Sequence, residues 1–393
     1  MLKWNLMNTK ERFLMILDFK KPDRCIDWEF AYWGGTINRW YKEGLHEVNG
    51  LVQKVEEGET IGGPGLYWSE DNPWIYAGDV DEHFGFDEGI RRPPVNIWIF
   101  PGYEVRVIDE GERKKEIVDK DGIRKIIMKD NSSMPYWLEW PVKDRRSWER
   151  VRRERLNLKK DSVEKRILTD KRTMISNIEN STYPVGLLGY PAGFFGSLRF
   201  LIGDVNLFML YYDDPALVKD ISSYLTDFWI DCCEEMLSWF DVDAVFFWED
   251  MAGRNGSLIS PKMFREFMTP CYRKLIGFLK SRGIKHFIVD TDGKVDELVP
   301  LFLETGITGV YPFERQAGND LLTFRKKYPK LQMMGGFDKN VLIKSKKEID
   351  DELDIVKECL KFGGYIPMAD HLIPPNVPFE IFEYYRNKIK QIL

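Results

Sequence analysis

Three consecutive stretches decide the fold: VDAVFFWED at residues 242–250, KHFIVDTDG at 285–293 and ITGVYPFERQ at 307–316. Each is a short apolar run that ends in acidic residues, and a segment of helical length and apolar spacing separates it from the next run. Working outward, similar runs occupy residues 25–30, 184–190, 331–335 and 364–368. Seven strand-and-helix units at this spacing predict an α/β fold, and specifically a (β/α)8 TIM-type barrel.

The hydrophobic period changes to two between residues 92 and 141. Tyr103, Val105 and Val107 alternate with polar residues, and Asp121-Gly122 precedes a second run at 123–128, which predicts an antiparallel β-hairpin. We therefore expect one domain over residues 1–393, with a β-hairpin insertion at about 91–142.

A charged helical connection is expected at residues 143–183. Its Lys- and Arg-rich sequence predicts solvated helices, and the alternative is an arm that binds phosphate or nucleic acid. The stretch lacks interleaved aromatic residues, so solvated helices are favoured.

The composition excludes several classes of protein. A net charge of −6 argues against nucleic acid or an anionic membrane as a partner. Five cysteines without a CxxC pair are typical of reduced thiols, and neither a secretory signal nor a run of about 18 apolar residues is present. A cytoplasmic location is the expectation. Thirteen tryptophans and 14% aromatic residues suit a flat-walled pocket for a small-molecule substrate.

Acidic residues follow the predicted strands. In a (β/α)8 barrel the loops after the strands build the active site, so these side chains are expected at one rim. The candidates are Glu249 and Asp250, Asp290 and Asp292, Glu314, Asp338, and Asp370 with His371. Any one of them could be only a helix cap, but converging carboxylates raise one another's pKa and are usually kept for a metal, a cationic ligand or proton transfer.

A divalent metal is the sharpest hypothesis for this rim. Asp290 and Asp292 are two residues apart at a strand end, and Gly293 frees the backbone to turn. With His371 they would form a set of two carboxylates and one His with open positions. The alternative, equally open at this point, is that Asp292 caps a helix at 294–305 while Asp290 pairs with an Arg.

Five segments, in order along the chain, resemble the uroporphyrinogen decarboxylase superfamily, which also contains the cobamide-dependent methyltransferases. They are NTKERFLMILDFKKPDR at 8–24, GFFGSLRFLIGDVNLFMLYYDDPALVKDI at 193–221, SLISPKMFREFMTPCYRKLI at 257–276, MMGGFDKNVL at 333–342 and ADHLIPPNVPFEIFEYY at 369–385. The resemblance implies a distorted (β/α)8 barrel with its site at the C-terminal mouth. Dimers are common in the family, so a homodimer is a further expectation.

Two departures from the family bear on the chemistry. The decarboxylases carry an Arg-rich motif after the first strand, where this chain has WEFAYWGGTINRW with Trp33 and only Arg39. The zinc-dependent methyltransferases use His-x-Cys and a later Cys, where this chain has Asp290-Thr-Asp292 and His371. Carboxylate oxygens are harder ligands, in the chemical sense, than the thiolates they replace. This set could bind zinc or another divalent ion, and the alternative is a site that binds no metal.

The resemblance implies a methyltransferase that takes a methyl group from a small methylated substrate and passes it to a corrinoid held by a partner protein. Glu249, Asp250, Asp290 or Asp292 would then be acids or metal ligands, with Glu314, Asp338 and Asp370 as further catalytic candidates. Trp33, Arg39, Arg315 and Gln316 are the candidates for substrate binding. The alternatives are a decarboxylase of a porphyrinogen or a smaller acid, and a non-catalytic barrel that binds a small ligand.

Overall fold

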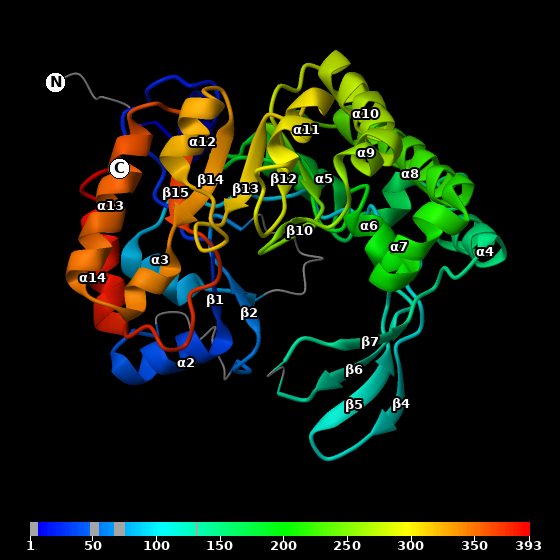
Figure 1. The fold of residues 1–393 in the computed structure, drawn as a ribbon, viewed down its shortest axis with the longest axis horizontal. Helices are drawn as coiled ribbons and strands as arrows, with labels where there is room; N and C mark the ends of the chain where they lie inside the picture. Colours follow the sequence, from blue (N-terminus) through cyan, green and yellow to red (C-terminus); the bar gives the residue numbers. More distant parts are fainter. Residues whose placement is uncertain (1–6, 48–54, 67–74, 131–132) are drawn as a thin grey trace.

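The computed structural model describes residues 7–47, 55–66, 75–130 and 133–393 (Figure 1). Residues 1–6 lie outside the described residues. The prediction that the N-terminal segment is not a secretory signal concerns these residues in part. Among those described, no helix has the length and apolar character needed to cross a membrane.

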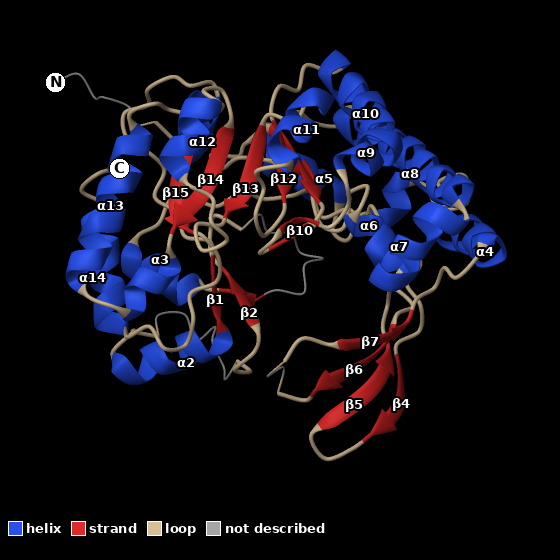
Figure 2. Cartoon of the chain, viewed as in Figure 1, coloured by secondary structure: helices blue, strands red, loops and turns tan. Residues whose placement is uncertain are grey.

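A six-stranded parallel sheet forms the centre of the molecule (Figure 2). Its strands are β8 (Gly186–Leu188), β9 (Ala244–Trp248), β12 (Phe287–Asp290), β13 (Gly309–Phe313), β14 (Gln332–Phe337) and β15 (Tyr365–Ala369). They lie in the order β15-β14-β13-β12-β9-β8, and each adjacent pair is parallel. All six coincide with apolar runs predicted as strands. Because each adjacent pair is parallel, the C-terminal ends of all six strands share one edge of the sheet.

Both faces of this sheet are buried, as is usual for parallel strands. In β9, Phe246 belongs to one apolar cluster with Ile288 and Tyr311, whereas Val245 and Phe247 belong to a second cluster formed with the helices. The helices that follow the strands are α8 (Pro215–Leu237), α10 (Thr269–Ser281), α11 (Leu298–Thr305), α12 (Leu321–Lys327), α13 (Lys346–Leu360) and α14 (Phe379–Ile389). Side-chain caps fix several starts, including Asp214 for α8 and a Ser345–Glu348 capping box for α13.

The predicted strand at residues 25–30 is not a regular strand. The segment instead receives single bonds from a glycine-rich stretch, because the N–H of Gly63 donates to the Phe30 oxygen and the N–H of Gly65 to the Glu29 oxygen, both at 2.9 Å. The strand begins later, as β1 (Ala31–Trp33), and pairs with β2 (Thr60–Gly62), which pairs with β3 (Ile75–Tyr76). The described residues therefore show an α/β fold whose central parallel sheet has six strands, where a barrel of eight was expected.

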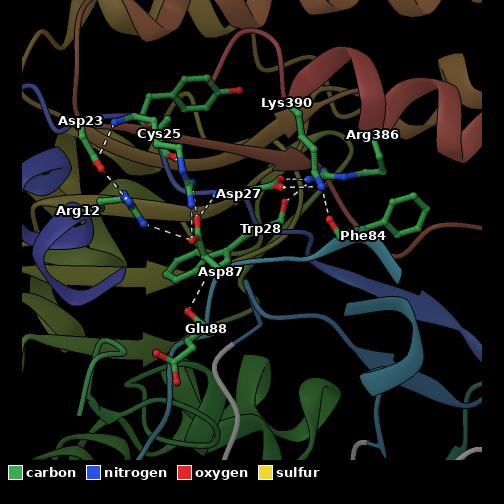
Figure 3. A network of polar contacts seen from close by, with 12 residues as sticks. Arg12, Asp23, Cys25, Asp27, Trp28, Phe84, Asp87, Glu88, Arg386 and Lys390 are labelled. Carbon is green, nitrogen blue, oxygen red and sulfur yellow. Dashed lines mark hydrogen bonds and ion pairs between the residues drawn. The ribbon is translucent and has the colours of Figure 1, made fainter. Parts of the chain in front are cut away.

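Ion pairs hold the irregular segments near the N-terminal helix α1 (Thr9–Leu17) (Figure 3). The pairs are Arg12 with Asp23 at 2.8 Å, Arg24 with Asp87 at 2.6 Å, and Arg386 of α14 with Asp27 and with Glu29, the last at 3.1 Å. The Arg386 side chain is 1% exposed. The buried guanidinium of Arg386 lies between two carboxylates and holds the 25–30 segment against α14. The segment is therefore held in place although it does not form regular β-sheet hydrogen bonds.

A separate four-stranded antiparallel sheet projects from the body (Figure 1). It consists of β4 (Arg106–Glu110), β5 (Lys114–Val118), β6 (Arg124–Met128) and β7 (Tyr136–Glu139), paired in sequence order. The predicted Asp-Gly turn joins β5 to β6, with Gly122 at a φ of 80°. The predicted runs at 103–107 and 123–128 overlap β4 and β6, but these two strands do not pair with each other, because β5 lies between them. The structure therefore adds β5 and β7 to the predicted strands.

The charged stretch that follows forms α4 (Arg145–Arg155), a 3-10 turn (Val163–Arg166) and α5 (Lys171–Glu179). Trp148, Val151 and Leu156 are fully buried, while most of the basic side chains face outward, so α4 is the solvated amphipathic helix that the sequence predicted. The remaining elements are α2 (Gly34–Glu43), α3 (Gly78–Phe84), α6 (Gly196–Ile202), α7 (Asp204–Asp213), β10 (Ala252–Gly253), β11 (Gly256–Ser257), α9 (Pro261–Met263), a π-helical turn (Phe264–Met268) and a 3-10 turn (Lys339–Ile343).

Candidate active site

Acidic side chains leave five neighbouring strands at the same edge of the parallel sheet. They are Glu249 and Asp250 after β9, Asp290 and Asp292 at the end of β12, Glu314 after β13, Asp338 after β14, and Asp370 with His371 after β15. The structure gives these residues different surroundings. Some lie in a partly exposed cluster. Others accept hydrogen bonds from backbone or side-chain groups inside the protein.

Asp292, Glu314 and His371 form the central cluster. One oxygen of each carboxylate and one ring nitrogen of His371 all lie within 4.8 Å of one another, and this is the one group of three such side chains in the part of the chain that the structure describes. His371 Nε2 lies 3.4 Å from Asp292 Oδ2. All three side chains are partly exposed, so solvent or a substrate reaches them.

Backbone and amide groups orient the Glu314 side chain. The N–H of Gly293 donates to Glu314 Oε2 at 2.7 Å, and the buried Asn319 donates to the main-chain oxygens of Gly293 (2.9 Å) and Glu314 (2.8 Å). Asn319 Oδ1 also accepts from the N–H of Val295. Gly293 has a φ of 83°, and a Cβ there would lie 2.6 Å from the Ala252 oxygen, so only glycine suits this turn. Asn319 thus ties the loops that carry Asp292 and Glu314.

The donor atoms of this cluster fit a divalent ion. Two carboxylate oxygens and one imidazole nitrogen are a common set with positions left for water or substrate. Donors around one such ion lie at most about 4.2 Å apart, because each is about 2.1 Å from it. The donor atoms lie within 4.8 Å of one another, so a modest rotation of a partly exposed side chain would bring all three within binding distance of one ion. The observed set contains Glu314, whereas the sequence pattern predicted Asp290 as the third ligand.

Asp290 and Asp292 have separate places. Asp290 ends β12 in register with Tyr311, and alternation along the strand puts it on the face that carries Ile288. It is 8% exposed and is not a member of the cluster. Asp292 does not cap a helix, because α11 begins at Leu298 with Glu297 at its N-cap position. The capping alternative for Asp292 is wrong.

Asp250 lies beside the cluster and has a perturbed pKa. Burial raises the pKa of its carboxyl, the negative charge of Asp292 adds to that effect, and Arg199 opposes it. Arg199 donates to Asp250 Oδ2 at 2.7 Å and to its main-chain oxygen at 2.6 Å, while also pairing with Asp204. With a φ of 42°, Asp250 is held in the left-handed region by these bonds. The Asp250 side chain is 34% exposed, so solvent reaches its carboxylate.

Glu249 is a structural carboxylate. It is fully buried and accepts the N–H groups of Phe194 (2.7 Å), Phe195 (2.6 Å) and Gly196 (3.0 Å), as well as the Tyr272 hydroxyl. Burial raises the pKa of Glu249, and these donors oppose the rise. With its oxygens engaged, Glu249 fixes the start of α6, and the structure does not bring it to the cluster.

Asp338 and Asp370 hold backbone turns. Asp338 accepts from the N–H of Asn340 at 2.9 Å as the cap of the 3-10 turn. Asp370 is fully buried and accepts from the N–H groups of Gln316 (3.1 Å) and Lys339 (3.2 Å). Burial raises the pKa of Asp370 to about 6. Both residues position the rim, and Asp370 does so by joining the loops after β13 and β14.

Of the four candidates for substrate binding, one lies at the cluster and the others form contacts elsewhere. Gln316 lies at the cluster, because its Nε2 is 3.4 Å from Glu314 Oε1 and its Oε1 accepts from Asn340. Arg315 turns away into ion pairs with Glu352 (2.9 Å) and Asp320 (3.1 Å), which leave its charge balanced.

Trp33 and Arg39 both contact the segment that follows His371. The N–H of Trp33 donates to the Ile373 oxygen at 3.2 Å, and Arg39 donates to the Pro375 oxygen while pairing with Glu43 at 2.6 Å. These two residues therefore border the loop that carries His371.

Sequence reasoning missed Asn319 and Arg199. Asn319 is five residues beyond Glu314 in a loop, and its only sequence signal was its place next to Asp320, the cap of α12. Arg199 lies within α6, so no local pattern linked it to Asp250. Both act through contacts between segments that are distant in sequence.

Comparisons with known proteins agree with this architecture. The sequence model of the family described as uroporphyrinogen decarboxylase (URO-D) matches residues 150–392, which is more than half of the chain. A search of curated proteins found no match. Among solved structures, a methyltransferase from Methanosarcina mazei is similar in fold, with a TM-score of 0.53, 14% sequence identity, and coverage of 98% of this chain and 99% of that one.

Proposed function

The chain belongs to the uroporphyrinogen decarboxylase family, and from that premise we propose that it is a methyltransferase that passes a methyl group from a small methylated substrate to a corrinoid on a partner protein. The observation that carries the proposal is the cluster of Asp292, Glu314 and His371, which combines a metal-type donor set with exposure to solvent. The fold it shares with the methyltransferase from Methanosarcina mazei supports the same class.

The electrostatics of the rim support a neutral or cationic substrate over a polyanion. A porphyrinogen with many carboxylates would need free cations, yet the arginines placed near the rim are each paired with a carboxylate. Arg39 pairs with Glu43, Arg199 with Asp204 and Asp250, and Arg315 with Glu352 and Asp320. An O-methyl aromatic compound or a methylated amine avoids this mismatch.

The reaction we propose is a nucleophilic displacement at the methyl carbon. A reduced corrinoid held by the partner protein would supply the nucleophile, and the electron pair of the broken carbon–oxygen or carbon–nitrogen bond would stay on the substrate heteroatom. That heteroatom takes up a proton, and Asp250 is the candidate to supply it because its pKa is raised and its side chain is partly exposed beside the cluster. A divalent ion held by Asp292, Glu314 and His371 would act as a Lewis acid on the heteroatom.

We also propose that the fold closes into the family's barrel through irregular segments. Residues 25–30 are bonded to residues 63–65, the N–H of Ile90 donates to the Pro64 oxygen, and Arg91 exchanges bonds with Pro184 and Gly186 beside β8. On the other side, Cys25 donates to the Tyr365 oxygen at the start of β15. These contacts support a closed arrangement in which the missing strands are replaced by short extended pieces.

The test is methyl transfer to free cob(I)alamin, whose spectrum changes when methylcobalamin forms. The purified protein is offered a panel of O-methyl aromatics and methylated amines, and a donor-dependent loss of cob(I)alamin is expected. Asp292→Asn and Asp250→Asn should lower the rate by at least about 100-fold, in the range that general acid catalysis supplies. Asp296→Asn, an exposed carboxylate paired with Lys294, is the matched control and should keep full activity. No methyl transfer across the panel, or formation of coproporphyrinogen from uroporphyrinogen, would overturn the proposal.

A further inference from the structure

A groove separates the projecting antiparallel sheet from helix α4. Its volume is about 590 Å³, within the range of about 300–1,000 Å³ that is typical of small-molecule sites. The sheet contributes Arg106, Ile108, Val118 and Arg124, and α4 contributes Arg150. None of the carboxylates of the candidate active site lines it.

The groove is positively charged. Four cations line it, Arg106, Arg124, Lys143 and Arg150, against one carboxylate, Glu139. Glu139 already pairs with Arg124 and with Lys143, each at 3.0 Å, and Arg124 pairs as well with Glu116 at 2.5 Å. Arg106 and Arg150 have no ion-pair partner among the residues that the structure describes. Two guanidinium groups in one groove are therefore open to an anion from outside.

Two aromatic rings form fixed apolar walls beside these cations. Tyr103 packs on Gly122, where an added Cβ would lie 2.8 Å from the ring, and Trp140 packs on Gly203, where it would lie 2.6 Å from the indole. The φ angles of 80° and 86° at these glycines also disfavour other residues. Arg155 covers one side of Tyr103 at 4.6 Å from the ring centre. The walls are thus positioned before any ligand arrives.

We propose that this groove binds a multivalent anion that also carries a flat apolar group, of which a nucleoside diphosphate is the representative used below. The anion lies against Arg106 and Arg150, and the flat group lies between the walls formed by Tyr103 and Trp140. Guanidinium groups favour phosphate because they donate two parallel hydrogen bonds to it. The site is separate from the methyltransferase chemistry, and its test does not depend on that activity.

Isothermal titration calorimetry of the full chain with ADP, pyrophosphate and adenosine tests the site. ADP is expected to bind, pyrophosphate to bind more weakly, and adenosine to bind least, because only ADP offers both the charge and the ring. Arg106→Gln combined with Arg150→Gln should weaken ADP binding by about tenfold or more, since each removes a charge-assisted hydrogen bond. Arg146→Gln, on the same helix but outside the groove, should leave ADP binding unchanged.

Several results would overturn the proposal. They are the absence of ADP and pyrophosphate binding at millimolar concentration, ADP binding that the double variant does not weaken, and adenosine binding as tight as that of ADP. Both arginines are solvent-exposed and without ion pairs, so the variants should fold, and circular dichroism confirms this before titration. Weaker ADP binding at higher salt concentration is a further expected result, because the attraction is between exposed charges.

Discussion

His371 Nε2 lies 3.4 Å from Asp292 Oδ2, although the two residues follow different strands, β15 and β12, that are separated in the sheet by β13 and β14. Glu314, which follows β13, completes the group. Loops that are not adjacent in the strand order therefore meet at this edge of the sheet. This convergence defines the site on which the following predictions rest.

The first prediction separates two possible ligand sets. Protein purified without chelator is expected to contain about one divalent ion per chain, measured by mass spectrometry. Glu314→Gln and Asp292→Asn should each lose it, because each removes a charged donor from a three-residue set. Asp290→Asn should keep it, since Asp290 is outside the cluster. Metal loss in Asp290→Asn with retention in Glu314→Gln would instead support the set read from sequence.

The second prediction concerns Asn319 as a positioning residue. Asn319→Ala removes the amide that ties the Gly293 and Glu314 loops, so metal affinity should fall by about 10- to 100-fold, the usual cost of losing a group that orients a ligand. Competition with a chelator of known affinity measures the change. Asn180→Ala, whose amide bonds only the Ser176 oxygen on the surface, should have no effect. Unchanged affinity in Asn319→Ala would show that Glu314 is held by other contacts.

The third prediction is a pH dependence of stability that originates in Asp370. Its folded-state pKa of about 6 lies above the ordinary value of 3.8, so the folded protein binds more protons than the unfolded chain between these values. The contribution of Asp370 to stability therefore falls as pH rises through this window. From pH 5 to pH 7 the expected loss is about 1 kcal/mol.

Urea unfolding of the wild type and of Asp370→Asn at both pH values measures this contribution. The variant is expected to lose less stability than the wild type on going from pH 5 to pH 7. Its overall stability will also change, since an Asn side chain accepts only one of the two backbone bonds. An identical pH dependence in the two proteins would contradict the prediction.

The fourth prediction concerns the buried Arg386. Arg386→Met leaves the buried Glu29 without its cation and leaves Asp27 with only the longer pair to Lys390 at 3.6 Å. Removing one partner of a buried ion pair typically costs about 3–5 kcal/mol of unfolding free energy. Chemical denaturation should show a loss of this order. Arg265→Gln breaks the exposed pair with Glu304 and should cost far less, because solvent screens that pair. Equal losses in the two variants would mean that the irregular segments are held by other interactions.

The parallel strands were predictable because their sequence signal is local. Apolar runs such as that of β9 are bounded by polar residues and followed by capped helices, and the structure has a strand at each such position after residue 184. The segment 25–30 has the same composition, yet it is not a strand. A strand also requires a continuous neighbour, and the glycine-rich stretch beside it supplies only single bonds at Gly63 and Gly65.

The acidic rim was predictable as a group, whereas the role of each member was not. A carboxylate after a strand looks the same in sequence whether it accepts backbone N–H groups, as Glu249 and Asp370 do, or joins a cluster, as Glu314 does. Which of the two roles a carboxylate has depends on the hydrogen-bond donors that other segments of the chain place beside it. For Glu249 these are residues 194–196 and Tyr272, and for Glu314 they are Gly293 and Gln316.

The family, the six parallel strands and the edge of the sheet where the acids gather could all be predicted, because they follow from hydrophobic spacing and from residues close along the chain. Tertiary packing, in contrast, places Glu314 rather than Asp290 beside Asp292 and His371, and holds Arg315 in ion pairs. It also formed the basic groove from Arg106 and Arg150, which lie on different elements. Such assignments depend on distances between remote segments, which the packing of strands and helices sets and which no local pattern encodes.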